Sequence, residues 1–134
     1  MPDANQVLVT IAVSNDKLSI FPRREDDVAI YCNSRSMKDA PQSPEKPREL
    51  CWVVTGASAT QRVHIQAKNP GMGTFDREEW DVPGPHGERS ARSGFVKACP
   101  AQGHYAVWGY EVALYDGAER KDYIDPTIII KTDP

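Results

Sequence analysis

Apolar residues recur at every second position in several short runs of this chain, and no other feature constrains the fold as much. The longest run lies at 105–115, where one side is formed by Ala106, Trp108, Tyr110, Val112 and Leu114. Alternation with a period of two is typical of β-strands that bury one face. We find no stretch with the apolar stripe of an amphipathic helix. The pattern therefore predicts an all-β protein.

Turn-forming residues divide the chain into about eight expected strands. The turns include Asn15-Asp16, Asn69-Pro70-Gly71 and Asp116-Gly117. The strands are expected at 7–13, 17–20, 28–32, 50–55, 62–67, 95–99, 105–115 and 125–130. We expect the first two to form a hairpin. The spacing is typical of an antiparallel Greek-key β-sandwich, with a closed barrel as the alternative.

Two segments rich in Pro or Gly carry no apolar periodicity, and we expect both to be long loops. Residues 33–48 contain three prolines, and residues 71–94 contain only Phe75 and Trp80 as large apolar anchors. A length of 134 residues with 40% hydrophobic content suits one compact domain spanning 1–134. We see no internal repeat and no shift in composition that would mark a second domain.

The C-terminal third resembles small bacterial immunoglobulin-like or cupredoxin-like β-sandwich proteins of largely uncharacterised function. The resemblance rests on the run 103–112 (GHYAVWGYEV), then Asp116-Gly117, then 125–130 (DPTIII), and the strand with Trp52 followed by Phe75 is similar too. These motifs imply the architecture and carry almost no information about function.

One loop has the spacing of a copper site. Cys99 and His104 enclose a Cys-x4-His loop that looks like a blue-copper azurin-type loop, and His64 on an earlier strand could be the second imidazole. Such a site needs one thiolate and two imidazoles, usually with an axial Met. Trp108 stands where that Met would be, so we favour the alternative in which no metal or cofactor binds. In that alternative, Cys99 is a buried strand cysteine and His104 is an exposed turn residue.

The three cysteines are expected to be reduced and mostly buried. The order Cys32, Trp52, Cys99 is similar to the immunoglobulin pattern of a disulfide packed on a tryptophan, but Lys97 replaces the tyrosine of that pattern. Which cysteines pair, if any, stays open. No secretory signal is visible and no apolar run approaches the ~20 residues of a membrane span. We expect a cytoplasmic protein, or a periplasmic or secreted one if a signal has been removed.

Charge and motifs argue against several functions. The chain has 16 Lys plus Arg against 19 Asp plus Glu, a formal charge of -3, so we expect no nucleic-acid binding despite the basic residues Arg89, Arg92 and Lys97. Four acidic residues lie near Trp80: Asp76, Glu78, Glu79 and Asp81. They could supply the carboxylate pair of a glycosidase, but we favour the interpretation that they lie on a solvated loop. We find no motif for a catalytic nucleophile and expect no enzyme.

The remaining hypothesis is a non-catalytic binding or protein-interaction module. Its partner is expected to contact the loops 33–48 and 71–94, since a rigid frame presents function on loops. Tyr105 and Tyr115 lie opposite Trp108 and Tyr110 on their strand, and their face is a candidate partner surface if the second sheet leaves it uncovered. The alternatives are a copper-binding electron-transfer protein and a self-associating structural subunit that pairs through an edge strand.

Overall fold

The computed structural model describes residues 6–22, 28–32, 47–68, 74–75, 77–82, 90–94, 96–97, 99–101 and 104–132. Within these ranges the protein has strands and no helix, which confirms the all-β prediction. The ten strands are β1 (Gln6–Ser14), β2 (Lys17–Phe21), β3 (Ala29–Cys32), β4 (Glu49–Thr55), β5 (Gln61–Ala67), β6 (Glu79–Val82), β7 (Ser90–Arg92), β8 (Tyr105–Asp116), β9 (Glu119–Ile124) and β10 (Thr127–Thr132).

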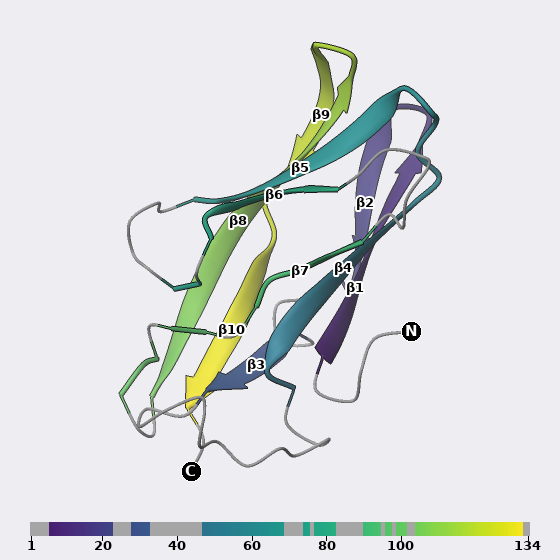
Figure 1. The fold of residues 1–134 in the computed structure, drawn as a ribbon. Helices are drawn as coiled ribbons and strands as arrows, with labels where there is room; N and C mark the ends of the chain where they lie inside the picture. Colours follow the sequence, from purple (N-terminus) through teal and green to yellow (C-terminus); the bar gives the residue numbers. More distant parts are fainter. Residues whose placement is uncertain are drawn as a thin grey trace.

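A four-stranded sheet has the order β2-β1-β4-β7. β1 and β2 form the expected hairpin around Asn15 and Asp16, which both have positive φ angles, of 53° and 60°. Asn and Asp tolerate this left-handed conformation, and two such residues suit a tight turn between twisted strands. On its other side β1 pairs with β4 in parallel. Figure 1 shows β1, β2 and β4 side by side.

A six-stranded sheet has the order β3-β10-β8-β5-β6, with β9 paired to β8. The long strand β8 is its centre: the first half pairs with β10, the second half with β9, and β5 lies along the opposite edge (Figure 1). β3 pairs with β10 in parallel. Both sheets are therefore mixed, and the expectation of a purely antiparallel arrangement is wrong. Hairpin turns suggest antiparallel neighbours, but β1–β4 and β3–β10 are distant in sequence and are brought together by tertiary packing.

The inner faces of the two sheets share one hydrophobic core. An aromatic cluster lies at its centre, built from Trp52 of the four-stranded sheet and, from the other side, Phe75, Trp80, Trp108 and Tyr110. The Trp52 ring centroid lies 5.0 Å from that of Trp80 and 5.5 Å from that of Tyr110. Such tilted and edge-on contacts are the favoured geometry for buried rings. The prediction that Phe75 and Trp80 anchor their segment is confirmed, since both are buried.

Four strand assignments differ from the prediction. β6 and β7 lie within 71–94, which we expected to be a loop, and β9 lies between the strands expected at 105–115 and 125–130, where we expected none. In 95–99, the described residues Val96, Lys97 and Cys99 are not in a strand. β6 and β7 are only four and three residues long, too short to show a clear alternation of apolar and polar residues. Pairing with β5 and β4 stabilises them as strands instead. Residues 33–46 of the other expected loop lie outside the described ranges.

A disulfide bond joins Cys32 to Cys99, so the expectation of three reduced cysteines is wrong for these two. The two Cα atoms lie 6.0 Å apart, within the usual range for a disulfide. Cys51, which is buried on β4, is not part of this disulfide. The sequence separation of 67 residues explains the error, because nothing local shows that the two positions meet. No helix in the described ranges is long and apolar enough to span a membrane.

Candidate functional site

Alternation along β8 separates a buried face from an outer one. Trp108 and Tyr110 point into the core, whereas Tyr105 is 67% exposed and Val107 53% exposed. Tyr115, on the same outer side, is partly buried. The four-stranded sheet packs against the inner side of β8. The side that carries Tyr105 is therefore left uncovered, which is the condition that we set for a candidate partner surface.

An apolar patch lies on the outer face where β8, β10 and β3 run together. In one row across the strands, Val107 is opposite Ile129, and Ile129 is opposite Ala29. In the next row, Lys131 lies between Tyr105 and Tyr31. Ile129, Ala29 and Tyr31 are each partly exposed. We refer to Tyr105, Val107, Ile129, Ala29 and Tyr31 as the apolar patch.

A charged cluster occupies the far end of the same outer face, on β5 and β6. His64 Nδ1 lies 2.8 Å from Asp81 Oδ1, and His64 Nε2 lies 3.6 Å from Glu79 Oε1. Arg62 Nη1 donates to the same Asp81 oxygen at 3.1 Å. A His–Asp pair can serve as a general base. The residue facing His64 on β8 is Ala113, which has no group for such a base to activate.

Two arginine–tyrosine pairs lie beside the charged cluster. The Arg62 guanidinium lies over the Tyr115 ring at 4.9 Å, and that of Arg120 over Tyr123 at 4.3 Å. Arg120 also donates to Glu111 Oε1 at 2.7 Å. Stacking and ion pairing hold both planar groups against the sheet. We did not anticipate Tyr123, because β9 was missed; its sequence, four charged residues followed by Tyr and Ile, has no alternation that would predict a strand.

Residues in the described part of the chain line hollows on the outer face and between the sheets. A shallow depression of about 360 Å³ lies on the outer face between the apolar patch and the charged cluster, lined by Gln66, Ala67, Lys68 and Glu111. A groove of about 380 Å³ lies where the two sheets meet, between β2 and the junction of β9 with β10. Its lining residues are Leu18, Ser19, Ile20, Ile124, Asp125 and Pro126.

The edge of β2 beside this groove is partly protected. The backbone N–H of Leu18 donates to Asp122 Oδ2 at 2.7 Å, so a side chain from the other sheet occupies a position that a new strand would need. Pro22, which follows β2, has no N–H to offer. Both features are common ways of blocking strand addition at a sheet edge.

The candidate copper ligands are not assembled as a copper site. Cys99 Sγ is bonded to Cys32, so it is not the free thiolate that a blue-copper site requires. His64 belongs to the charged cluster, and His104 is exposed in a turn in which its N–H donates to Ala101 O at 2.9 Å. Among the described residues, no group of three His, Cys, Asp or Glu side chains is arranged to hold a metal ion.

The other candidate residues are dispersed. Glu79 and Asp81 project outward from β6 and Trp80 projects inward, so the carboxylates do not enclose the aromatic ring. Arg92 Nε lies 4.0 Å from Glu49 Oε1. Asp76, Arg89 and most of the two expected partner loops lie outside the described ranges, so their proposed contacts stay a prediction.

Comparisons with known proteins add no function to this geometry. A scan of family models, a search of curated proteins and a search of solved structures each found no match.

Proposed function

We propose that this protein is a non-catalytic binding module that recognises a protein partner through the outer face of its six-stranded sheet. The observation that carries the proposal is the exposure of Tyr105 and Val107 in a continuous apolar patch with Ile129. Tyrosines and aliphatic side chains on a rigid frame bury contact area at low entropic cost. The charged cluster on the same face provides polar groups at the rim of such an interface.

A non-catalytic role is supported by the surroundings of His64. Its hydrogen bond to Asp81 is on an open sheet surface, and Ala113 stands opposite it. General-base catalysis needs a substrate or a water held with its proton within hydrogen-bond reach of the base, and an open sheet surface holds neither in a fixed position. The protected edge of β2 also lends no support to self-association through that strand.

We further propose a β-sandwich of immunoglobulin-like or cupredoxin-like type. Two sheets with a shared core support the sandwich, and a buried cysteine of a disulfide in the same core as Trp52 is a point of likeness to immunoglobulin domains. The parallel pairs β1–β4 and β3–β10 depart from the antiparallel pattern. The fold type and the binding role are separate proposals.

The binding proposal is tested with two matched variants. Val107→Glu places a charge in the apolar patch, and Phe21→Glu places one on the other sheet, at a side chain that is 71% exposed. Both variants are first checked for unchanged circular dichroism. The expected result is that a partner captured from the natural source by the wild type is retained by Phe21→Glu and lost by Val107→Glu. Equal capture by all three proteins, or capture by none, would overturn the proposal.

A further inference from the structure

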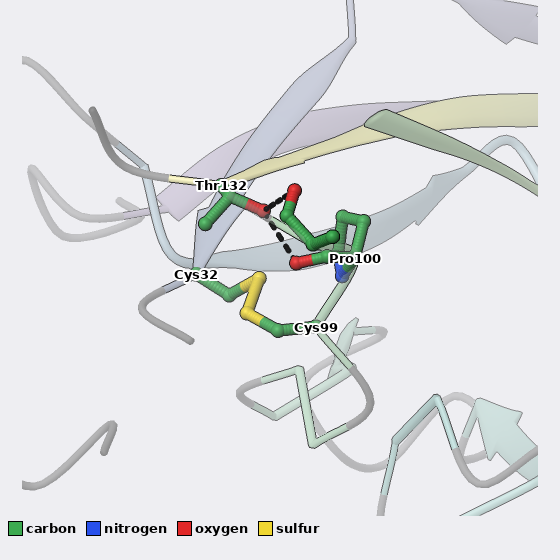
Figure 2. The surroundings of a disulfide bond; sticks show 5 residues. Cys32, Cys99, Pro100 and Thr132 are labelled. Atoms are coloured by element: carbon green, nitrogen blue, oxygen red, sulfur yellow. Dashed lines mark hydrogen bonds between the residues drawn. A yellow bond between two sulfur atoms is a disulfide. The ribbon is translucent and has the colours of Figure 1, made fainter. Parts of the chain in front are cut away.

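The segment 99–101 is attached to the six-stranded sheet at two adjacent points. Cys32 and Thr132 are neighbours at the ends of the parallel strands β3 and β10. Cys32 holds the segment through the disulfide to Cys99, and the Thr132 hydroxyl donates to Pro100 O at 2.8 Å and contacts Ala101 O at 3.3 Å. Figure 2 shows both attachments side by side.

We propose that the Cys32–Cys99 disulfide is a redox-sensitive clasp that controls the attachment of residues 99–101 to the six-stranded sheet, without unfolding the two-sheet core. This inference does not depend on what the protein binds. The segment leads directly into β8, whose first residue is Tyr105. Opening the clasp therefore loosens the connection that enters the apolar patch.

Burial decides which side of the clasp moves. Val28 and Ile30 are fully buried in the core beside Cys32, so β3 stays docked by hydrophobic packing after the bond is broken. By contrast, Cys99 and Pro100 are only partly buried and Ala101 is exposed. Once the disulfide is reduced, the attachments described for this segment are the Thr132 hydroxyl and the packing of the partly buried Cys99 against the core. Both are weak compared with a covalent bond, so we expect this solvated segment to open readily.

Accessibility also decides how the clasp opens. Cys32 is fully buried and Cys99 is partly exposed, so the thiolate of an external dithiol attacks Cys99 Sγ. The disulfide breaks, Cys32 leaves as a thiolate and takes up a proton, and a mixed disulfide forms on Cys99. The second thiol of the reductant then displaces Cys99, which is also protonated. Two electrons and two protons pass to the protein, and the dithiol leaves as its own disulfide.

The third cysteine does not interfere with this exchange. Cys51 is buried on β4 in the four-stranded sheet, whereas Cys32 lies in the six-stranded sheet. Burial holds Cys51 in its own sheet, whereas the Cα atoms of Cys32 and Cys99 lie 6.0 Å apart in the fold, so we expect these two to re-form the same bond on oxidation. The clasp is therefore closed in oxidising surroundings and open where dithiol reductants are abundant.

Amide hydrogen exchange of the full chain, measured by NMR with and without dithiothreitol, tests the clasp. The His104 N–H, which is bonded to Ala101 O, should exchange at least tenfold faster after reduction. The Tyr31 N–H on β3, bonded to Pro47 O at 2.8 Å, and the amides of β5 should stay strongly protected, with any acceleration no larger than the loss of global stability allows. Loss of protection at Tyr31 or in β5, or no change at His104, would overturn the proposal.

Variants separate the two attachments. Thr132→Val removes the hydroxyl and keeps the side-chain shape, so it should change His104 exchange less than threefold in the oxidised protein and add to the effect of reduction. Cys51→Ser should respond to dithiothreitol like the wild type, because it leaves the disulfide in place. Cys32→Ala/Cys99→Ala should exchange rapidly at His104 whether or not dithiothreitol is present. A Cys51→Ser protein without a response would contradict the assignment of the clasp to Cys32 and Cys99.

Discussion

Trp52 Nε1 donates a hydrogen bond to the Tyr110 hydroxyl across the core, at 3.2 Å, and so joins β4 of one sheet to β8 of the other. Both side chains are almost completely buried. A buried polar group without a partner costs about 1–3 kcal/mol, so each of these two residues depends on the other.

Trp80 provides a matched comparison for this bond. Its Nε1 is buried and finds no acceptor in the described part of the chain. Trp52→Phe and Trp80→Phe remove the same atoms, but only Trp52→Phe breaks a hydrogen bond and leaves the Tyr110 hydroxyl without its donor. We expect Trp52→Phe to lower the free energy of unfolding in urea by about 1–2 kcal/mol more than Trp80→Phe. Equal losses would argue against the bond.

Burial raises the pKa of Tyr110 from 10.0 to about 12, although the Trp52 hydrogen bond opposes this shift. The folded protein therefore keeps the phenol proton over a range in which the unfolded chain has lost it. This contribution to stability is fully present below pH 10 and is lost as the pH rises from 10 to 12, at up to about 1.4 kcal/mol per pH unit.

Tyr110→Phe should be the less pH-dependent protein in that window. Unfolding free energies at pH 9, 10 and 11 would measure this difference. The pKa of Lys121 is also raised, by its hydrogen bond and charge interaction with Glu119, so its contribution to stability also falls as the pH rises. This change is the same in both proteins and cancels in the comparison. Parallel pH profiles for variant and wild type would contradict the prediction.

Thiol counting checks the disulfide itself. The denatured, unreduced protein should react with one equivalent of a thiol reagent, at Cys51, and with three after reduction. Cys32→Ala/Cys99→Ala should lower the free energy of unfolding by about 4 kcal/mol, because the bond closes a loop spanning 67 residues of the unfolded chain. Three reactive thiols before reduction would mean that the disulfide had not formed.

Two glycines with positive φ angles should differ sharply in their tolerance of alanine. A Cβ on Gly56, at φ +81°, would lie 2.3 Å from the backbone oxygen of Val13, whereas one on Gly117, at φ +62°, would meet nothing within 4 Å. Gly117→Ala should cost only about 1 kcal/mol of backbone strain. Gly56→Ala must also shift β1, and we expect its melting temperature to fall by several degrees more.

Adjacent residues on β6 test the register that sequence reasoning missed. Val82 is buried opposite Val63, whereas Asp81 is on the outer face, where its side chain is 61% exposed. Val82→Ala should destabilise the protein by about 1–3 kcal/mol. Asp81→Asn should change stability by less than about 1 kcal/mol, since exposed ion pairs contribute little. The reverse order, measured by urea unfolding, would place β6 in the wrong register.

The sequence by itself determined the elements that carry a strong local signal. Alternation over 105–115 specifies the strand, and it specifies the buried side for Trp108, Tyr110, Val112 and Leu114, because a period of two separates the faces of any sheet. It fails at the small residues Ala106, which is exposed, and Ala113, which is buried. Asn15-Asp16 and Asp116-Gly117 specify two hairpins, because few residues adopt their backbone angles. Phe75 and Trp80 could be predicted to anchor their segment because they are large apolar side chains.

Only the tertiary structure decided the features that join distant residues. Three such features are the parallel pairing of β3 with β10, the meeting of Cys32 with Cys99, and the position of Asp81 beside His64. Each depends on which strands and segments become neighbours in the fold, and no local pattern encodes such contacts. The short strands β6 and β7 are stabilised by their neighbours rather than by their own sequences. For the same reason the apolar patch became visible only when β3, which is distant in the chain, was placed beside β10 and β8.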